Sequence, residues 1–323
     1  MNSRDECHRI PGTPILVDAF RKRAPAPGML YILSHFHGDH YGALSERWDT
    51  TVHCSSLTAR LCVEVLGVEP QYIVGHEFGE IFQMGDAKVH LLSAHHCAGA
   101  AMIVVEVAGR RYLHTGDCRV CPTMLADPLL PRGAVDCIFL DSTYAHPRFE
   151  FPTQDAIVST VTADIKAALE EEPSTLVVIC AYTIGKERLF LGVAEKLGMK
   201  VYVGGGGQRR RSIFSCLDLP ETQRQLMVQE ASEASIHVVP MGFCGEVWPY
   251  FRPDFGQSET RLDEFGGRWK RVLGITPTGH VVGSNWNKNH SVVEGKGRVT
   301  LRLYAYSEHS SFPELVQLVQ QVK

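Results

Sequence analysis

The spacing of apolar residues changes its rhythm near residue 152. Before that point, short apolar runs alternate with polar turns, as at residues 15–17, 29–33 and 89–93, which is typical of strands. After it, helical spacing alternates with continuous apolar runs such as residues 176–180, as expected for a parallel sheet covered on both faces. The pattern therefore predicts a β-rich part followed by an α/β module.

Several helix boundaries are marked by local capping signals. Ser and Thr favour the position before a helix because their side chains accept hydrogen bonds from the first free backbone N–H groups. A Glu three residues later completes a capping box, and a Gly commonly ends a helix. Helices are predicted from Ser55 or Ser56 to Leu66, from Thr153 to Leu169, from Ser311 onward, and over residues 218–234.

The composition is that of an ordinary folded protein. Of the 323 residues, 44% are apolar and 21% are charged, so a sizeable core is expected and wholesale disorder is excluded. The formal net charge of −4 gives no chain-wide basic signature for nucleic acid. A basic groove confined to part of the surface is still compatible with this charge.

The cysteines and the apolar runs bear on the compartment. Most of the ten cysteines lie inside apolar runs, as at Cys62, Cys137 and Cys180, which is how buried free thiols occur. Without a signal peptide, this predicts a reduced intracellular protein. Cys118 and Cys121 form a C-x-x-C pair with no second pair, which disfavours a zinc finger or a redox motif. No apolar run approaches the ~18 residues of a membrane span.

A histidine-rich stretch follows the apolar run at residues 29–33. Residues 34–41 read S-H-F-H-G-D-H-Y, with the pattern H-x-H-x-D-H. His35 and His37 project to the same side of an extended backbone, whereas Asp39 and His40 must turn to a second direction. This arrangement suits two neighbouring metal ions better than one tetrahedral structural site. The alternative is a polar loop that is rich in histidine by chance.

Further residues of metal-binding type stand at the ends of other predicted strands. Loops at one edge of a β-sandwich bring such strand ends together. An ordinary β-rich domain has no need of His or Asp at consecutive strand ends, so the recurrence favours a metal centre. The candidates are His35 and His37, His96, Asp117, Asp141 and, near the end of the chain, His309. Asp18 also ends a strand, as either a solvated turn residue or an acid that orients a ligand.

These residues resemble the motif series of the metallo-β-lactamase fold. Residues 35–40, His96, Asp117 and Asp18 match that series, and Asp141 and His309 are similar to the additional motifs of its β-CASP nucleic-acid-processing branch. Three further strings resemble the DNA cross-link repair 5′-exonuclease group, whose loss sensitises cells to nitrogen mustard. They are I-P-G-T with V-D-A-F within residues 10–20, Y-T-I-G-K-E at 182–187 and P-T-G at 277–279.

The resemblance implies an α/β fold, an αββα metallo-β-lactamase sandwich with an inserted α/β β-CASP domain. The expected domains are residues 1–155 and 286–323 for the sandwich and 156–285 for the insertion. Two positions depart from the family pattern, because His95 stands in the place of Asn and Cys118 in the place of Phe. The family motif that separates DNA from RNA enzymes is expected beyond Lys323.

By the same resemblance, the histidines and carboxylates divide into metal ligands and catalytic acids. His35, His37 and His96 are expected to hold a first ion, Asp39, His40 and His309 a second, and Asp117 to bridge them. Nitrogen and oxygen ligands suit zinc, as one or two ions, and manganese or magnesium is also compatible. Two ions supply what phosphodiester hydrolysis needs: a nucleophile, alignment and charge neutralisation. The expected catalytic carboxylates are Asp18, Asp39, Asp117 and Asp141, with Asp18 and Asp141 orienting ligands or accepting a proton.

A second functional stretch is expected where residues 182–187 follow a buried strand and open a helix. Backbone N–H groups and the helix dipole favour an anion there, and Lys186 adds a positive charge. The resemblance makes it a pocket for the 5′-phosphate of DNA, with Tyr182, Thr183, Lys186, Thr278 and Ser307 as its residues. After a run of four glycines, Arg209, Arg210 and Arg211 are expected to contact the DNA backbone, the alternative being a solvated loop.

The predicted function is metal-dependent 5′-to-3′ exonuclease action on single- or double-stranded DNA with 5′-phosphate ends, in interstrand cross-link repair. This implies a nuclear protein with DNA repair proteins as partners and no membrane association. The alternatives are a β-CASP RNA nuclease, a non-catalytic scaffold that binds DNA ends or repair proteins, and hydrolysis of a lactam or thioester. Competent residues at every ligand position disfavour the scaffold, and the inserted domain and phosphate motif disfavour the last.

Overall fold

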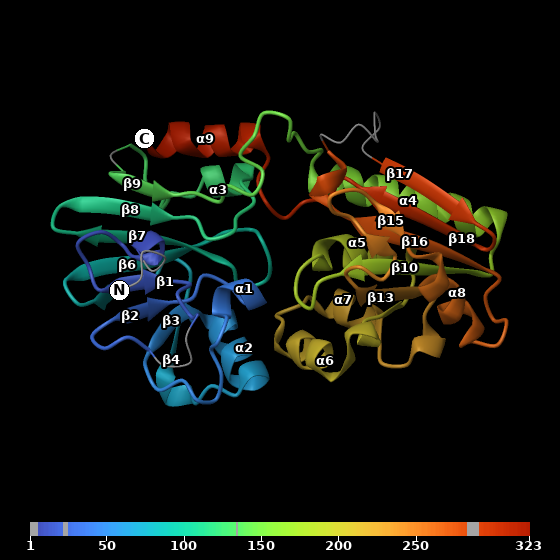
Figure 1. Ribbon diagram of the computed structural model, residues 1–323, viewed down its shortest axis with the longest axis horizontal. Helices are drawn as coiled ribbons and strands as arrows, with labels where there is room; N and C mark the ends of the chain where they lie inside the picture. Colours follow the sequence, from blue (N-terminus) through green and yellow to red (C-terminus); the bar gives the residue numbers. More distant parts are fainter. Residues whose placement is uncertain (1–5, 22–24, 134, 283–290) are drawn as a thin grey trace. The chain divides into compact units, whose positions relative to one another are not determined.

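The computed structural model describes residues 6–21, 25–133, 135–282 and 291–323. The chain forms two compact units (Figure 1). The first comprises Met1–Pro147 together with Glu308–Lys323, and the second comprises Arg148–Ser307. Each unit combines helices with a β-sheet core, and each is described by itself below.

The first unit contains two β-sheets. The first sheet is parallel, in the order β1 (Ile15–Val17), β2 (Leu30–Ile32), β3 (Val52–Ser55) and β4 (Ile73–His76). The second follows the chain order β5 (Ile81–Met84), β6 (Ala87–Ser93), β7 (Ala101–Val107), β8 (Arg110–His114) and β9 (Cys137–Phe139). Its pairs are antiparallel except for β8 and β9. Strands β7 and β8 form a hairpin whose turn contains Gly109.

Residues of β6 alternate between two apolar cores, one on each face of the second sheet. Val89 and Leu91 belong to the core that β1 and β2 close, whereas Leu92 packs in the core that contains residues of α3 (Pro122–Leu125) and α9 (Phe312–Val322). On the first sheet, α2 (Ser56–Leu66) packs against β3 and β4. The remaining short helices are α1 (Gly38–Tyr41), η1 (Glu6–His8) and η2 (Pro70–Tyr72). The expected αββα sandwich is confirmed.

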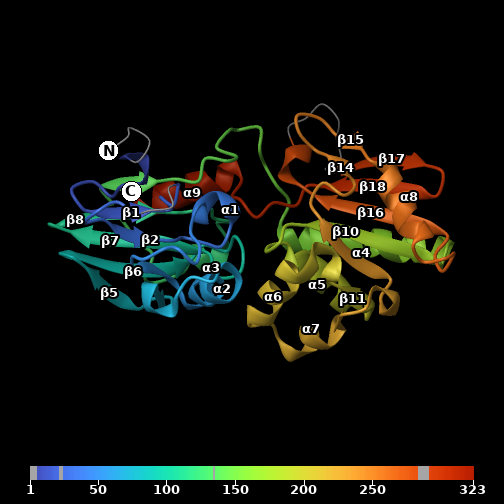
Figure 2. The same cartoon turned by 60° about the horizontal axis from the view of Figure 1, so that its bottom comes forward.

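The second unit is built on one seven-stranded sheet. Its order is β12 (Met227–Val228), β11 (Val201–Tyr202), β13 (Ile236–Pro240), β10 (Thr175–Ala181), β16 (Arg271–Pro277), β18 (Val299–Tyr304) and β17 (Ser291–Lys296). All pairs are parallel except β17–β18. All seven residues of β10 are buried, as its continuous apolar run predicts. The edge hairpin β14 (Gly245–Glu246) and β15 (Arg252–Pro253) is labelled in Figure 2.

The second unit contains several helices, and the first of them begins directly after its predicted capping residue, Thr153. They are α4 (Gln154–Glu171), α5 (Glu187–Leu197), α6 (Gly207–Cys216), α7 (Glu221–Leu226), α8 (Phe255–Asp263), η3 (Gly204–Gly206), η4 (Ala231–Glu233) and η5 (Gly279–Val281). The Thr153 side chain caps α4, as Ser55 caps α2. Ser311 and Glu314 form the predicted capping box of α9.

Two sequence-based expectations are corrected. Residues 218–234 do not form one helix, because Met227–Val228 pairs as strand β12 with β11 and interrupts it. The domain boundaries lie after residues 147 and 307 instead of 155 and 285. The second shift has a clear cause, since β18 pairs in register with β16 and therefore belongs to the sheet of the second unit. A tertiary pairing of this kind leaves no local signal in the sequence.

All ten cysteines are free thiols. Among the described residues, every helix is too short or too polar to cross a lipid bilayer.

His237 of β13 is a buried residue that couples stability to pH. Its ring packs against the rings of Phe265 and Trp269, and its Nε2–H donates to the carbonyl of Ala231 at 2.9 Å. Burial, reinforced by the nearby charge of Arg261, lowers the pKa of His237 to about 4. A histidine whose folded pKa lies below its unfolded value of ~6.5 takes up protons preferentially when unfolded. Its contribution to stability is complete above pH ~6.5 and declines toward pH ~4.

We therefore expect the unfolding free energy of the wild-type protein to fall between pH 7.5 and pH 5. This decrease should be about 2 kcal/mol larger than the decrease in the His237→Gln variant. Glutamine keeps a donor for the Ala231 carbonyl but does not titrate. Urea unfolding at both pH values, followed by tryptophan fluorescence, measures the difference. Other histidines titrate equally in both proteins, so equal losses would show that His237 is not the cause.

Candidate metal centre

The loop after β2 places the first histidines in a buried position. Ser34 and His35 have no exposed surface, and backbone hydrogen bonds to residues of β3 and β7 fix this segment on both sides. His37, in extended conformation, then stands at the start of α1. That short helix turns the backbone so that the Asp39 side chain is exposed, whereas the His40 ring lies 4.0 Å from the His35 ring, centre to centre.

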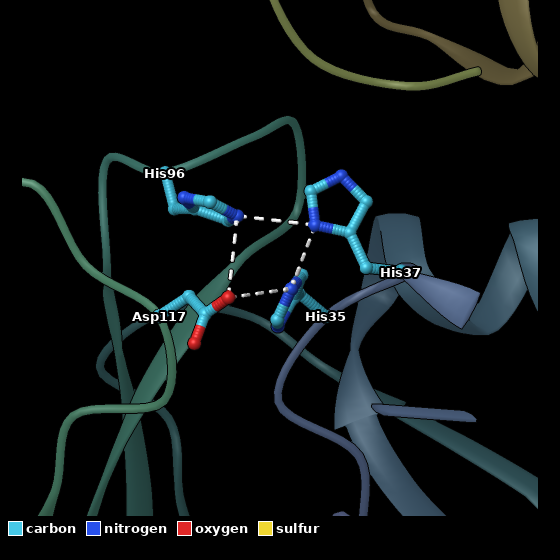
Figure 3. A group of neighbouring side chains, drawn as sticks. All are labelled: His35, His37, His96 and Asp117. Atoms are coloured by element: carbon cyan, nitrogen blue, oxygen red, sulfur yellow. Dashed lines mark hydrogen bonds and ion pairs between the residues drawn. The ribbon is translucent and has the colours of Figure 1, made fainter. Parts of the chain in front are cut away.

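Four side chains converge in the first unit (Figure 3). His37 Nδ1 lies 2.9 Å from His35 Nε2 and 3.1 Å from His96 Nε2. Asp117 Oδ2 lies 3.6 Å from His35 Nε2 and 3.7 Å from His96 Nε2. A tetrahedral ion with bonds of about 2.0–2.1 Å separates its ligand atoms by about 3.3 Å. The donor set and its spacing therefore fit one tetrahedral metal ion.

Hydrogen bonds behind this cluster point the ring nitrogens inward. His96 Nδ1–H donates to the carbonyl of Glu308 at 2.9 Å, and His35 Nδ1 lies 2.9 Å from the hydroxyl of Ser34. Burial, reinforced by the neighbouring histidines, lowers the pKa of His96 to about 3 and also lowers the pKa of His35. Neutral imidazole is the form that binds metal, so burial favours the ligand state of both rings.

Asp18 orients His40. Its carboxylate accepts hydrogen bonds from the backbone N–H and the hydroxyl of Ser34, at 2.7 and 2.6 Å, and lies 2.8 Å from His40 Nδ1. The Asp18 backbone has a φ of 55°, a region uncommon for residues other than glycine and typical of constrained functional positions. His40 Nε2 faces Asp117 Oδ2 at 3.3 Å. This geometry is that of the orienting acid that the sequence predicts.

The carboxylates of Asp18 and Asp117, which lie on either ring nitrogen of His40, favour its protonated form. Burial disfavours the cation, but hydrogen bonds and attraction to Asp117 and Asp18 outweigh burial and raise the pKa of His40 to about 11. For Asp18, burial acts to raise the pKa, and the His40 cation outweighs it and lowers the pKa. The surroundings of Asp117 therefore stabilise positive charge, which a bound metal cation can supply in place of the proton.

Asp141 orients His309 in the same way as Asp18 orients His40, through its carboxylate and the Nδ1 atom of the ring. Asp141 Oδ2 lies 2.9 Å from His309 Nδ1 and accepts the backbone N–H of Cys118 at 3.1 Å. Burial acts to raise the pKa of Asp141, but His309 outweighs it and lowers the pKa to about 2. Asp117, Asp141 and His309 form a further group whose potential ligand atoms lie within 4.8 Å of one another. A second metal position beside Asp117 is thus outlined.

Asp39 differs from the other predicted ligands. Its side chain is 82% exposed, and its Oδ2 lies 3.8 Å from His40 Nε2. It stands outside the close groups that contain the other six predicted ligands. Asp39 nevertheless lines a cleft of about 510 Å³ together with His40 and the other predicted catalytic carboxylates. These are Asp18, Asp117 and Asp141. The structure therefore brings the predicted residues to one region, with Asp39 at its open side.

Two groups that fix the site were not expected from the sequence. Ser34 holds both Asp18 and His35, and its only signal is its place directly before the histidine motif. The carbonyl of Glu308 orients His96, and a backbone carbonyl leaves no signal at all. The structure also separates His96, which is buried in the cluster, from His95, which is exposed with a φ of 52°. Asparagine tolerates that conformation well, which accounts for its place in the family pattern.

The residues of the predicted phosphate pocket lie in the second unit. Tyr182 and Thr183 are exposed at the end of β10, whereas Lys186 is 5% exposed and has a φ of 69°. The Lys186 Nζ lies 5.8 Å from the ring centre of Tyr182 and 5.1 Å from that of Tyr306. Thr278 and Ser307 are also buried. This turn presents a cation within an aromatic frame at the start of α5.

The expected role of Arg210 in contacting DNA is corrected. Its side chain is 1% exposed, and its guanidinium donates to the carbonyls of Val238, Ala181 and Tyr182 at 3.1, 2.9 and 2.9 Å. Arg210 therefore ties the middle of β13 to the end of β10 and is not available to a phosphate. Arg209 is exposed, whereas Arg211 is half-buried and donates to the Gln208 side chain. They remain candidates for backbone contact.

Comparison with known families matches both parts of the chain. Residues 13–179 match the family described as beta-lactamase superfamily domain, and residues 221–323 match the family described as DNA repair metallo-beta-lactamase. A crystal structure of a protein of unknown function from Enterococcus faecalis V583 has the same fold, with a TM-score of 0.53 and 12% identity. The match covers 91% of this chain and 73% of that one.

Curated relatives align with nearly the whole chain. DNA ligase 6 of Arabidopsis thaliana is 35% identical over 98% of this chain and 22% of its own length. The DNA cross-link repair protein SNM1 of the same plant is 34% identical over 97% of this chain and 63% of its own length. The 5′ exonuclease Apollo of Gallus gallus is 32% identical over 97% of this chain and 61% of its own length. The chain thus spans between 22% and 63% of these relatives.

The family predicted from the motifs is confirmed by these matches, which include both the sandwich and the region that follows it. The chain belongs to the β-lactamase superfamily and, within it, to the DNA repair metallo-β-lactamases.

Proposed function

We propose that the chain carries the catalytic core of a metal-dependent DNA 5′-to-3′ exonuclease of interstrand cross-link repair. The proposal rests chiefly on Asp117, whose Oδ2 lies 3.3 Å from His40 Nε2 and 3.6 and 3.7 Å from the Nε2 atoms of His35 and His96. A carboxylate between two sets of histidines is what a pair of neighbouring ions requires. Relatives named as a DNA cross-link repair protein and a 5′ exonuclease support DNA as the substrate and the direction of cutting.

Zinc is the metal that the donor set favours. The ligands are imidazole nitrogens and carboxylate oxygens at tetrahedral spacing, and they include no sulfur. His35, His37, His96 and Asp117 would hold one ion, and His40, Asp39 and His309 would join Asp117 around the other. Such ions, when bound, activate water and neutralise the charge that develops on the phosphate.

The remaining chemistry belongs to the side chains. Asp18 and Asp141 have lowered pKa values, so both are ionised at neutral pH. Asp18 holds the Nδ1 atom of His40, and Asp141 holds the Nδ1 atom of His309. Fixed rings present Nε2 without rearrangement, which is what an orienting carboxylate contributes to a metal site. Asp39 brings an exposed carboxylate to the open side of the cleft.

The turn at residues 182–186 is proposed to bind the terminal 5′-phosphate. Lys186 supplies the charge, and the start of α5 supplies backbone N–H groups and the favourable end of the helix dipole. Thr183, Thr278 and Ser307 add hydroxyl groups. A site for the terminal phosphate accounts for an enzyme that begins at a 5′ end. The proposed setting is the nucleus, with single- and double-stranded DNA and other DNA repair proteins as partners.

Parallel digestion of single-stranded DNA and RNA of the same sequence, both with a 5′-phosphate, tests the proposal. We expect DNA to be shortened and RNA to be degraded far more slowly. Asp39→Ala provides a control for contaminating nucleases, because it changes a predicted ligand at the surface and leaves the core intact. Preferential degradation of RNA would establish an RNA nuclease instead, and binding of DNA ends without cleavage would establish a scaffold.

A further inference from the structure

The hairpin β14–β15, labelled in Figure 2, carries two aromatic side chains that the proposed mechanism does not use. Trp248 and Tyr250 lie in the connection between Glu246 and Arg252, with 61% and 52% of their surface exposed. Four large apolar side chains are exposed among the described residues of the second unit. Three of them are aromatic, the third being Tyr182 of the phosphate turn. Several exposed aromatic side chains in one unit are more typical of a binding surface than of side chains that serve only to pack the core.

The two hairpin rings are braced by neighbouring cationic or titratable groups. The Trp248 ring lies 5.1 Å from the ring of His280, at an interplanar angle of 49°. The Arg252 guanidinium lies 5.3 Å from the centre of the Tyr250 ring, and it also pairs with Glu246 across the hairpin. Each ring is thus in contact with a neighbouring group and still has more than half of its surface exposed.

A short path of contacts joins this hairpin to the phosphate turn. His280, which touches Trp248, donates its backbone N–H to the hydroxyl of Thr278 at 3.2 Å. The backbone N–H of Thr278 donates to the carbonyl of Tyr304 at 2.9 Å, and the N–H of Tyr306 donates to the same carbonyl at 2.7 Å. The Tyr306 ring in turn lies beneath Lys186. Both features thus belong to one continuous piece of the second unit.

We infer that Trp248 and Tyr250 form a stacking platform for unpaired nucleobases of the DNA strand whose 5′-phosphate occupies the Lys186 turn. The inference deepens the proposed function and rests on it for the choice of DNA. Stacking on exposed aromatic rings next to cations is how proteins hold single strands without reading their sequence. A protein partner would need a broader apolar patch, but Val293 is the only exposed large aliphatic side chain among the described residues of this unit. The platform therefore favours substrates with an unpaired 5′ end over blunt duplexes.

Kinetics with substrates that lack bases provide the first arm of the test. For a 5′-phosphorylated single strand, Trp248→Ala is expected to raise KM at least about fivefold with kcat little changed, since one base–ring stack is lost. Trp248→Phe, which keeps a ring, is expected to stay within about twofold of the wild type. On a strand with abasic sites in place of its first nucleotides, wild type and Trp248→Ala are expected to share one KM. Phe78→Ala, which removes an exposed ring of the first unit, serves as the matched control.

Fluorescence provides the second arm and does not depend on cleavage. In an Asp39→Ala background, a 5′-phosphorylated oligothymidylate is expected to quench the emission of exposed Trp248, and Trp248→Phe is expected to remove that quenching. The corresponding abasic oligomer is expected to bind without quenching. Thermal melting of each variant shows whether it is folded.

The outcomes separate the platform from the nuclease activity. If the wild type cuts DNA but Trp248→Ala keeps the wild-type KM and the fluorescence is unchanged by DNA, the platform is disproved and the proposed function stands. If the wild type cuts neither DNA nor RNA, the proposed function fails. In that case, quenching by the base-bearing oligomer alone still supports the platform, and equal quenching by the abasic oligomer overturns it.

Discussion

Replacing Asp117 by Asn is expected to lower DNA hydrolysis by about a thousandfold. A metal ion contributes several kcal/mol of charge stabilisation to the transition state, and each 1.36 kcal/mol is a factor of ten in rate. Asp117 Oδ2 is the oxygen that both groups of histidines approach. The neutral amide of Asn keeps its shape but is a much weaker metal ligand, so the loss appears in kcat and in metal content together.

Elemental analysis of the purified variant is the companion measurement. We expect two divalent ions per wild-type chain and at most one in Asp117→Asn. Asp86→Asn, in the exposed turn between β5 and β6, changes the same charge far from the cluster and is the matched control. An Asp117→Asn protein that retains both ions and wild-type kcat would place the metal centre elsewhere.

Replacing Lys186 by Met is expected to reduce the preference for 5′-phosphorylated over 5′-hydroxyl DNA by about ten- to a hundredfold. A hydrogen bond to a charged group contributes about 1.5–3 kcal/mol, and Met keeps most of the buried stem that packs against the rings of Tyr182 and Tyr306. The change lies in kcat/KM for the phosphorylated substrate, while the rate on 5′-hydroxyl DNA stays near the wild-type value.

A lysine at the other end of the same helix provides the control for this charge change. Lys196 lies in the last turn of α5, where its Nζ donates to the Ser159 hydroxyl, and Lys196→Met removes an equal charge. If Lys186→Met retains the full preference for a 5′-phosphate, the terminal phosphate binds at some other group.

The sequence predicted the sandwich, and it also predicted most of the residues that the structure gathers at the candidate metal site, because both depend on local patterns. Strand alternation, capping residues and His or Asp at strand ends are all visible in a single chain. The family resemblance already selected His96 over His95, and the structure adds that His96 is buried whereas His95 is exposed with a φ of 52°. Ser34 and the Glu308 carbonyl required the structure, because their roles arise from contacts between segments that are distant in sequence.

The errors have a common physical origin in tertiary context. A run of three arginines after glycines resembles a solvated basic loop, yet the second of them, Arg210, is buried and donates to carbonyls of the strands β13 and β10. Likewise, β18 joined the sheet of the second unit through pairing with β16, which moved the domain boundary to residue 307. Neither the burial of a charged side chain nor the partner of a strand is determined by the residues next to it.

The most direct measurement follows a 3′-labelled, 5′-phosphorylated single DNA strand during digestion, with and without prior removal of metal by a chelator. The proposed function predicts a ladder that shortens one nucleotide at a time from the 5′ end, its loss on chelation and its return when zinc is restored. Shortening from the 3′ end, cleavage only at internal positions, or digestion that persists after the metal has been removed would contradict it.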